Sequence, residues 1–464
     1  MENWIDAEIE NSVFSDKRLA SRLKKILNQF FAGFGGSIPA ACQDWKNTKA
    51  AYRFFANKNL TETAILEGHF QATKIRAATQ DETLLILHDT CEITYNRKSP
   101  EKVGYTRKCA NRKGLFDQVK QRAMCGILMH SSLVLTNTGV PLGFAAKKFW
   151  NRKKFKGAKS LYRTKNATRI PIEKKESFRW IEGISNSNKL LGKPNRLVHI
   201  GDREADIYEL FYQAPLEGSS FLIRSKVDRR TENEEITIND VLKKTRPRGK
   251  HTIFCWDKNG RKVAASLSIK FEKIRIKPSF GPKTKLYPDV EVYIIHAEER
   301  GKSRNREPIN WKLITNIPIR NLSEAVEKLR WYALRWKIEV FFKILKSGCN
   351  VANAKLRGAE NLCKLLSIYC ILAWRIFWMT MLQREPREIA VEKVLTKSEV
   401  KILDKIEKPT KAIQSLSDYL LKIARLGGYL GRSADGPPGN QVFWRGWKKL
   451  MEIQFGIRMH FVGN

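Results

Sequence analysis

The chain has 464 residues, of which 86 are Lys or Arg and 47 are Asp or Glu, and its formal net charge is +39. Because 42% of the residues are hydrophobic and 10% are aromatic, the chain can bury a large core and is not a disordered basic tail. A folded protein of this charge is expected to have a polyanionic partner, since its self-repulsion is otherwise unfavourable. Nucleic acid is the first candidate and an anionic membrane surface the second.

The membrane alternative finds little support in the sequence. No apolar run approaches the ~20 residues that span a bilayer, and the long run at 365–381 is interrupted by Ser367 and Arg375. Residues 1–6 lack the basic and apolar regions of a secretory signal. The eight cysteines form no CxxC pair and no zinc-like cluster, as is typical of free thiols in a reducing cytosol. We therefore expect a cytoplasmic protein without a membrane partner.

The first segment of the chain is predicted to be helical. Ser15 or Asp16 can cap a helix that ends in the glycine-rich segment 33–39, and a second helix is expected near 44–57. Apolar residues recur at helical spacing in the first helix, at Leu19, Leu23, Ile26, Leu27 and Phe30. A separate basic stripe consists of Arg18, Arg22 and Lys25. Such helices suit insertion into a DNA groove, although a solvated helix face is the simpler interpretation of the stripe alone.

From residue 83 the pattern changes to strands that alternate with helices. Two of the apolar runs end in an acid, the run before Asp89 and the run before Asp202. Further strands are predicted at 125–135, 140–145 and 221–224. Strands mixed with helices in this way predict an α/β sheet that is buried on both faces.

Residues 228–318 depart from this pattern. Short strands without a strong helix between them are predicted at 236–238, 251–255, 263–271, 290–296 and 311–315. The segment is therefore expected to be a β-rich insertion. A long helix is predicted over 322–346, and mostly helical sequence follows, with a last helix near 443–454.

Asp89 and Asp202 each follow the C-terminal end of an apolar strand. In open α/β sheets ligands bind at this edge, where a carboxylate is held on rigid backbone and remains accessible. Each acid could instead be an ordinary capping or turn Asp. Two acids at one edge can hold Mg²⁺, which prefers oxygen ligands. In a strongly basic protein the anion facing that metal would be a phosphodiester, attacked with the help of two metals about 3.5–4 Å apart.

A third acid lies on the long helix predicted over 322–346. Tyr332, Arg335, Glu339 and Lys346 are spaced so that, at ~100° per residue, they fall within about a 60° arc of one continuous helix, and Lys343 joins that face. An acid beside a cation and a phenol fits a metal site with phosphate clamps. The alternative is an exposed face stabilised by a Glu339–Lys343 pair.

These residues also resemble a known family. The pattern Tyr332-x2-Arg335-x3-Glu339-x6-Lys346 resembles the YREK signature of a group of bacterial DDE transposases, some of which cut and paste DNA through a hairpin. Residues 202–207 (DREADI) resemble that group's second acidic motif, and His88-Asp89-Thr90 resembles its first. Similar segments occur at 49–55, 221–226, 426–429 and 444–447, so the resemblance covers nearly the whole chain.

The resemblance implies a fold and a division into domains. It implies a ribonuclease-H-like mixed-sheet catalytic core at residues 73–360, interrupted by the β-rich insertion at about 228–318. Residues 1–72 would form a helical domain that binds the transposon end. Residues 361–464 would form a helical C-terminal domain for dimerisation and synapsis.

The resemblance also implies the chemistry of the site. Asp89, Asp202 and Glu339 would bind Mg²⁺ (or Mn²⁺), two ions per active site. The reaction would comprise strand nicking, hairpin formation and opening, and strand transfer, each an attack by water or a 3′-hydroxyl on phosphorus.

Several residues would contact DNA by the same resemblance. The expected phosphate and end-DNA contacts are Tyr332, Arg335, Lys343, Lys346 and Arg224. Trp311 would stack on an extruded base, which is worth about 1–3 kcal/mol; without the resemblance, core packing is the simpler interpretation. No apolar wedge residue can be placed, because residues 301–306 are polar.

The expected partners are double-stranded DNA, both transposon end repeats and target, and a second copy of the chain in a synaptic complex. The basic stretches 98–120 and 147–169 fit non-specific phosphate contacts. Two alternatives stay open: an RNase-H-fold nuclease that cuts DNA without strand transfer, and a non-catalytic regulator that occupies transposon ends.

Overall fold

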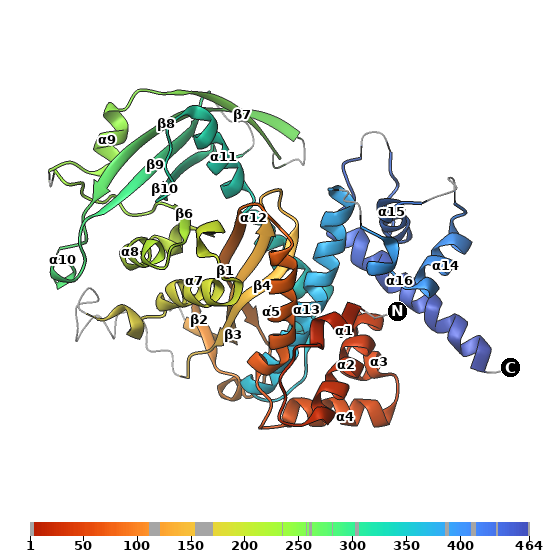
Figure 1. Cartoon of the computed structure of the whole chain (residues 1–464). Coiled ribbons are helices and arrows are strands. Elements are labelled where there is room, and N and C mark those ends of the chain that lie inside the picture. Colours follow the sequence, from red (N-terminus) through yellow and green to blue (C-terminus); the bar gives the residue numbers. More distant parts are fainter. Residues whose placement is uncertain are drawn as a thin grey trace, which may run out of the picture.

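A single mixed sheet forms the centre of the protein (Figure 1). The computed structural model describes residues 4–462 except 111–120, 154–169, 234, 257, 259–261, 281, 302–305, 386–388, 410–413 and 433–434. Within these residues the strands are β1 (Leu84–Thr94), β2 (Tyr105–Ala110), β3 (Gln121–Thr136), β4 (Pro141–Trp150), β5 (Leu197–Gly201), β6 (Ser220–Arg224), β7 (Gly249–Trp256), β8 (Lys262–Ile276), β9 (Val290–Glu299) and β10 (Asn310–Thr315). Their order is β2-β3-β1-β5-β6-β10-β9-β8-β7, and β4 pairs with β3.

The strands that carry the two predicted aspartates form a mixed core within this sheet. Strand β1 pairs antiparallel with β3 and parallel with β5, and β5 pairs parallel with β6. The residues of β5 are all buried, as expected of a strand covered on both faces. The predicted α/β class is confirmed, and the arrangement is consistent with an RNase-H-like core between helical N- and C-terminal regions.

The β-rich insertion extends the core sheet, because β10 pairs antiparallel with β6 and β9, β8 and β7 follow in turn. The strand predicted at 236–238 is wrong. Thr237 caps the helix α9 (Ile238–Lys244) and forms a reciprocal capping box with Asp240. A second helix, α10 (Pro282–Leu286), lies between β8 and β9. The helices between these strands are thus short, with seven residues in α9 and five in α10, in line with the expectation of no strong helix there.

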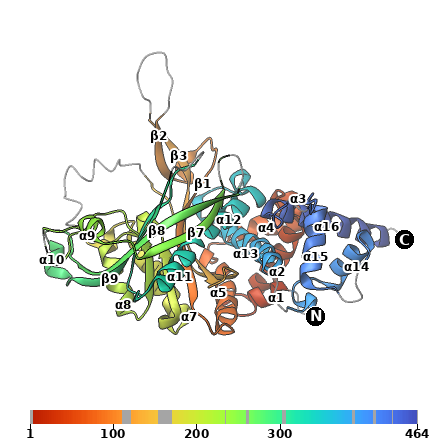
Figure 2. The same ribbon diagram turned by 90° about the horizontal axis from the view of Figure 1, so that it is seen from above.

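Helices cover both faces of the sheet (Figures 1 and 2). Helices α7 (Phe178–Leu191) and α8 (Tyr208–Leu216) pack on one face in a cluster that includes Trp180. Helices α12 (Trp336–Lys343) and α13 (Ala359–Arg384) pack with the opposite face. Strands β1 and β5 therefore lie between two helical layers.

The N-terminal region is helical, as predicted. Its helices are α1 (Trp4–Ile9), α2 (Lys17–Ala32), α3 (Ile38–Cys42), α4 (Trp45–Ala56) and α5 (Glu62–Ala78). Asp16 caps α2, whose apolar stripe is buried, while the side chain of Arg18 in the basic stripe is 92% exposed. On α4, Trp45 and Tyr52 are exposed beside basic residues, an arrangement that can face nucleic acid.

The C-terminal region consists of α13, α14 (Lys397–Ile406), α15 (Leu416–Leu426) and α16 (Asn440–Val462). Among the described residues α13 is the one helix long and apolar enough to cross a membrane, but 94% of its most apolar window is buried inside the protein. We therefore interpret it as a core helix. The ring of Trp447 on α16 lies 4.5 Å from that of Phe31, so the two ends of the chain pack together.

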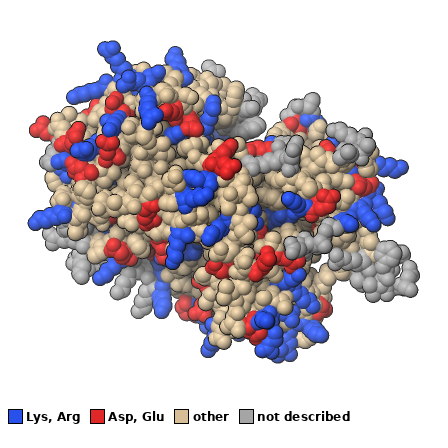
Figure 3. All heavy atoms as spheres, viewed as in Figure 1, with Lys and Arg blue, Asp and Glu red and all other residues tan. Residues whose placement is uncertain are grey.

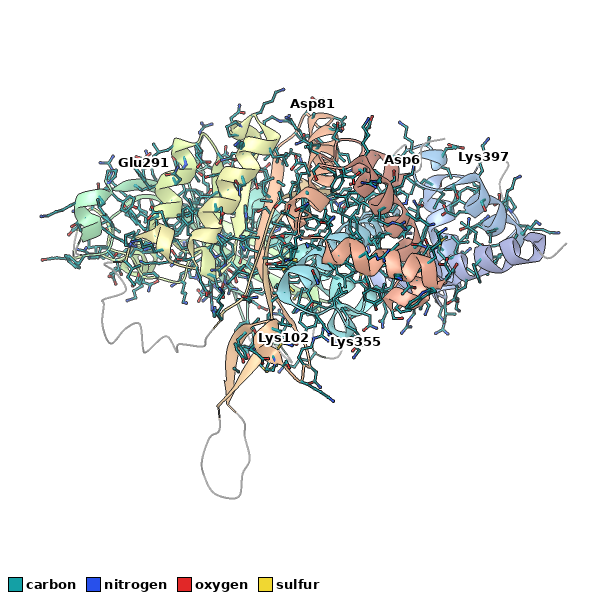
Figure 4. The ribbon with its side chains drawn as sticks, turned by 90° about the horizontal axis from the view of Figure 1, so that it is seen from below. Asp6, Asp81, Lys102, Glu291, Lys355 and Lys397 are labelled. Atoms are coloured by element: carbon teal, nitrogen blue, oxygen red, sulfur yellow. The ribbon has the colours of Figure 1, made fainter. Side chains whose placement is uncertain are left out.

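Basic side chains are spread over the face shown in Figure 3, with acidic side chains among them. Strands β2 and β3 project from the body, and Lys102 and Lys355 lie beside the base of this ribbon (Figure 4). The predicted basic stretches 98–120 and 147–169 lie partly outside the described residues, at 111–120 and 154–169.

Candidate active site

The pairing of β1 with β5 brings Asp89 and Asp202 to the same level of the sheet. Leu87 is paired with Ile200 in the parallel register, and each aspartate follows two residues later. Neighbouring strands lie about 4.8 Å apart, so the two carboxylates are near neighbours. Asp202 follows the end of β5 as predicted, but the prediction that Asp89 follows the end of its strand is wrong. Strand β1 continues to Thr94, because residues 89–94 still pair with β3.

Backbone amides orient both carboxylates. The N–H of Thr90 donates to Asp89 Oδ1 at 2.7 Å, and the N–H of Glu204 donates to Asp202 Oδ1 at 2.8 Å. Asp202 thereby caps the short 3₁₀ helix Arg203–Ala205, so the simple capping interpretation also describes it. Each acid keeps its second carboxylate oxygen for another partner.

Glu339 comes from α12, but the continuous helix predicted over 322–346 is wrong. Helix α11 (Leu322–Ala333) ends before Arg335, which precedes the first residue of α12, and a π-helical turn, Ile344–Gly348, carries Lys346. At the break the amide of Arg335 donates to the carbonyl of Tyr332, three residues back, rather than four. Tyr332, Glu339 and Lys346 therefore lie on three successive segments, and Arg335 lies at the junction of the first two.

The guanidinium of Arg335 lies between two of the predicted acids. Its Nη2 is 2.6 Å from Glu339 Oε1, and its Nη1 is 3.5 Å from Asp89 Oδ2. The ion pair observed for Glu339 is therefore with Arg335, not with Lys343 as the alternative interpretation supposed. The Glu339 side chain is 57% exposed, whereas that of Asp89 is 18% exposed.

The carboxyl group of Asp89 has an unusual pKa. Burial, and next the negative charge of Asp202, raise its pKa to about 7, with a smaller contribution from Glu339; the Thr90 amide and Arg335 act in the opposite direction. Crowded carboxylates of this kind are stabilised by a cation, and their oxygens are the ligands that Mg²⁺ and Mn²⁺ prefer. The donor set therefore fits a divalent metal. In the part of the chain that the structure describes, no three Asp, Glu, His or Cys side chains already converge as ligands, and the Arg335 guanidinium provides the positive charge.

The predicted DNA contacts lie around these acids in different settings. Tyr332 is buried, and its ring packs edge to face with that of Trp311 at 5.3 Å. The partly buried Trp311 thus packs against the hydrophobic core, which is what the interpretation of Trp311 as a core-packing residue predicts. Lys343 and Lys346 are exposed.

Arg224 lines a cavity of about 520 Å³ next to the turn that follows Asp202. The cavity is strongly basic, since its lining includes Arg203, Arg224, Lys226 and Lys312. Arg224 donates from Nη2 to the carbonyl of Asn310 at 3.2 Å. A cavity with this charge beside the acids can accept a phosphate-bearing strand.

A buried histidine pair on β1 and β5 escaped the sequence analysis. His88 Nε2 lies 2.8 Å from His199 Nδ1, which joins β1 to β5 one residue before Asp89 and three residues before Asp202 in the chain. His88 Nδ1 is bonded to the hydroxyl of Ser132, and His199 Nε2 to the side chain of Asn188. Burial lowers the pKa of His88 to about 3. The only signal in the sequence was a histidine inside each of two otherwise apolar strands.

Two family models match the ends of the chain. The model described as Transposase DNA-binding matches residues 1–60, and the model described as Transposase Tn5 dimerisation domain matches residues 371–460. Both matches support a Tn5-like transposase. The first covers α1 to α4, and the second covers the C-terminal half of α13 together with α14 to α16.

The two matches support DNA and a second copy of the chain as partners, as the sequence predicts. They also support a DNA-binding transposase, an enzyme that cleaves and transfers DNA. Neither matched segment includes Asp89, Asp202 or Glu339, so the roles of these acids rest on the geometry described above.

Proposed function

We propose that this protein is a cut-and-paste DNA transposase that binds transposon end repeats and inserts the cleaved ends into target DNA. One observation carries the proposal: Asp89 and Asp202 lie level on adjacent parallel strands, and Arg335 links Asp89 to Glu339. The segments on either side of this site match transposase DNA-binding and dimerisation models. The reaction would proceed by strand nicking, hairpin formation, hairpin opening and strand transfer.

Asp89, Asp202 and Glu339 would hold the divalent metal, Mg²⁺ or Mn²⁺, with two ions per site. When bound, the metal activates an attacking water or 3′-hydroxyl and stabilises the leaving oxygen. The Thr90 and Glu204 amides hold Asp89 and Asp202 in fixed orientation before any ligand arrives. Such preorganisation avoids a rearrangement at the moment of reaction.

Basic side chains around the acids would orient the DNA. Arg335 would exchange its carboxylate partners for a phosphate of the cleaved end, and the exposed Lys343 and Lys346 lie on the adjoining turns of the chain. Arg224 would bind the end strand in the basic cavity. The partly exposed Trp311 ring, which is in contact with Tyr332, would stack on an extruded base.

We further propose that three segments of the chain have different roles. Residues 1–72 would recognise the end repeat, residues 73–360 would catalyse the reaction, and residues 361–464 would support the synaptic dimer. The exposed Trp45 and Tyr52 on α4 offer aromatic surface within the first of these regions. The cell compartment would be the bacterial cytoplasm, in association with the nucleoid.

A cleavage and joining assay tests this proposal. The substrate is a duplex with the inverted repeat that borders this reading frame, offered intact and pre-cleaved, with supercoiled plasmid as target and Mg²⁺ or Mn²⁺. The transposase should nick the intact end and join the pre-cleaved end to the plasmid. Cleavage without joining would favour a nuclease of the same fold. End binding with neither reaction would favour a non-catalytic regulator.

A further inference from the structure

Arg179, at the start of α7, makes three hydrogen bonds just behind the acids. Its Nε donates to the hydroxyl of Thr90 at 3.0 Å, its Nη2 to Glu204 Oε2 at 2.7 Å, and its Nη1 to the carbonyl of Glu176 at 2.9 Å. The Arg179 side chain is 12% exposed, whereas that of Glu204 is 62% exposed. A mostly buried guanidinium thus connects β1 to the turn after β5.

The two side-chain partners of Arg179 are the residues that hold the two aspartates. Thr90 donates its N–H to Asp89, and Glu204 donates its N–H to Asp202. One planar guanidinium therefore fixes both amide donors relative to each other. Because Arg binds through a rigid fork of donors, it can set a distance that a single point charge cannot.

Further side chains hold Thr90 and Arg179 in place. The Thr90 hydroxyl lies 3.0 Å from His130 Nδ1. Because burial holds the pKa of His130 well below its ordinary value, the neutral ring can accept a hydrogen bond from that hydroxyl. The Arg179 guanidinium also lies 5.6 Å from the ring centroids of Trp150 and Trp180. These contacts restrict the Arg179 side chain to one orientation.

We propose that Arg179 is a positioning residue that sets the spacing of Asp89 and Asp202 for a divalent cation, acting through Thr90 and Glu204. The inference rests on the proposed function, since it takes these two acids as metal ligands. Partners one step removed from metal ligands typically change metal affinity by 10–100-fold when they are removed.

The direction in which metal affinity changes when Arg179 is removed distinguishes a positioning role from a purely electrostatic one. Arg179 is a cation close to Asp202. If it acted only through its charge, its removal would strengthen the binding of another cation. If it positions the carboxylates, its removal weakens metal binding although a repelling charge has been lost. Arg179→Lys keeps the charge but cannot reach both partners through one nitrogen, so it should also weaken binding.

The experiment is calorimetric titration of the full-length, DNA-free protein with MnCl₂. The variants are Arg179→Gln, Arg179→Lys and Glu204→Ala, and the last removes the acceptor of the same connection at a position whose side chain is 62% exposed. Arg152→Gln is the matched control, because Arg152 bonds the Glu176 carboxylate at 2.7 Å in the same region. Melting temperatures without metal monitor the fold.

We expect Mn²⁺ affinity to fall about tenfold or more in the Arg179 and Glu204 variants and to stay within about twofold in the control. Unchanged or tighter binding in the Arg179 and Glu204 variants, with the wild type binding Mn²⁺, would overturn the positioning role alone. An equal loss in the Arg152 control would also overturn it, since any local change would then suffice. A wild-type protein that does not bind Mn²⁺ would overturn the proposed metal site and this inference with it.

Discussion

The guanidinium of Arg335 lies 3.5 Å from the carboxylate of Asp89 while it also binds Glu339 at 2.6 Å. Burial tends to lower the pKa of Arg335, but Glu339, Tyr332 and Asp89 outweigh it and raise that pKa, so the charge is permanent. In the absence of ligands this cation neutralises carboxylates that would otherwise repel each other. Binding of DNA phosphate and of metal at this site would therefore be linked through one side chain.

Glu339→Gln should abolish cleavage and leave end binding within about threefold of wild type. The side chain is 57% exposed and packs little, so the fold should tolerate the change, with a loss of stability of about 1 kcal/mol or less. Cleavage of a labelled end duplex and its retention in a gel measure the two properties. Glu327→Gln, at another exposed acid on the preceding helix, is the control. Wild-type cleavage by Glu339→Gln would remove this residue from the active site.

Binding to DNA should weaken steeply as salt is added. With a net charge of +39 and basic residues at both the end-binding helices and the candidate site, we expect six to ten phosphates to be neutralised. Affinity for a mixed-sequence duplex should then fall roughly 10³–10⁵-fold between about 50 and 200 mM salt. Fluorescence anisotropy over that range gives the slope. A nearly flat slope would mean that most of the basic residues face water.

That the two acids lie level could be predicted because the signal is local: continuous apolar runs end at Asp89 and at Asp202, and two such runs pair in parallel. The end of β1 could not be predicted, because residues 89–94 include polar side chains and stay in the strand through their pairing with β3. The fold class followed from the same pattern. The helix α9 was missed because apolar residues alternate at 236–238, although Thr237 and Asp240 carried a readable capping signal.

The break before Arg335 and the role of Arg179 depend on tertiary contacts. Neither Pro nor Gly marks the break, so local propensity favours one continuous helix there. Arg179 follows Phe178 at the start of an ordinary amphipathic helix, and nothing in its sequence neighbourhood indicates partners 89 residues before and 25 residues after it. Arg179 meets Thr90 and Glu204 only because β1 and β5 pair in the folded sheet.

The N-terminal helices should loosen at low pH through Glu8. This buried carboxylate on α1 binds Arg76 and His69 of α5, each at 2.5 Å, and Arg76 also donates to the Leu142 carbonyl of β4 at 2.6 Å. Burial acts to raise the pKa of Glu8, but Arg76 and His69 outweigh it and lower the pKa from 4.5 to about 2. A depressed carboxyl pKa stabilises the fold above the ordinary value, and the contribution is lost as pH falls from about 4.5 towards 2.

Glu8→Gln provides the measurement. The variant should be less stable than wild type by a few kcal/mol near neutral pH, and the difference should shrink as pH falls below about 4.5. His69 works in the same direction, because burial lowers its pKa and stability is lost as it becomes protonated. Urea unfolding at a series of pH values follows the difference, with Glu10→Gln, at an exposed carboxylate two residues further along the chain, as control. A difference independent of pH would show that Glu8 contributes through packing alone.

The second aspartate of the DREADI segment should matter for stability rather than for metal binding. Asp206 is buried and accepts the N–H groups of Lys226 and Val227 at 2.6 and 2.7 Å, and it also pairs with the buried Arg229. It thereby fixes residues 225–228, which follow Arg224. These residues form one wall of the basic cavity.

Asp206→Ala would leave Arg229 as a buried charge without its carboxylate, a change that typically costs about 3–5 kcal/mol. We expect that loss in urea unfolding, and partial recovery in the double variant Asp206→Ala, Arg229→Leu, which removes the unpaired charge. Asp228→Ala is the control, because that exposed acid accepts the N–H of Asn239 on the same segment. Mn²⁺ affinity of the folded variant should stay within about threefold of wild type, since Asp202 keeps its own amide donor from Glu204. A stable Asp206→Ala protein that has lost Mn²⁺ binding would instead place Asp206 among the metal ligands.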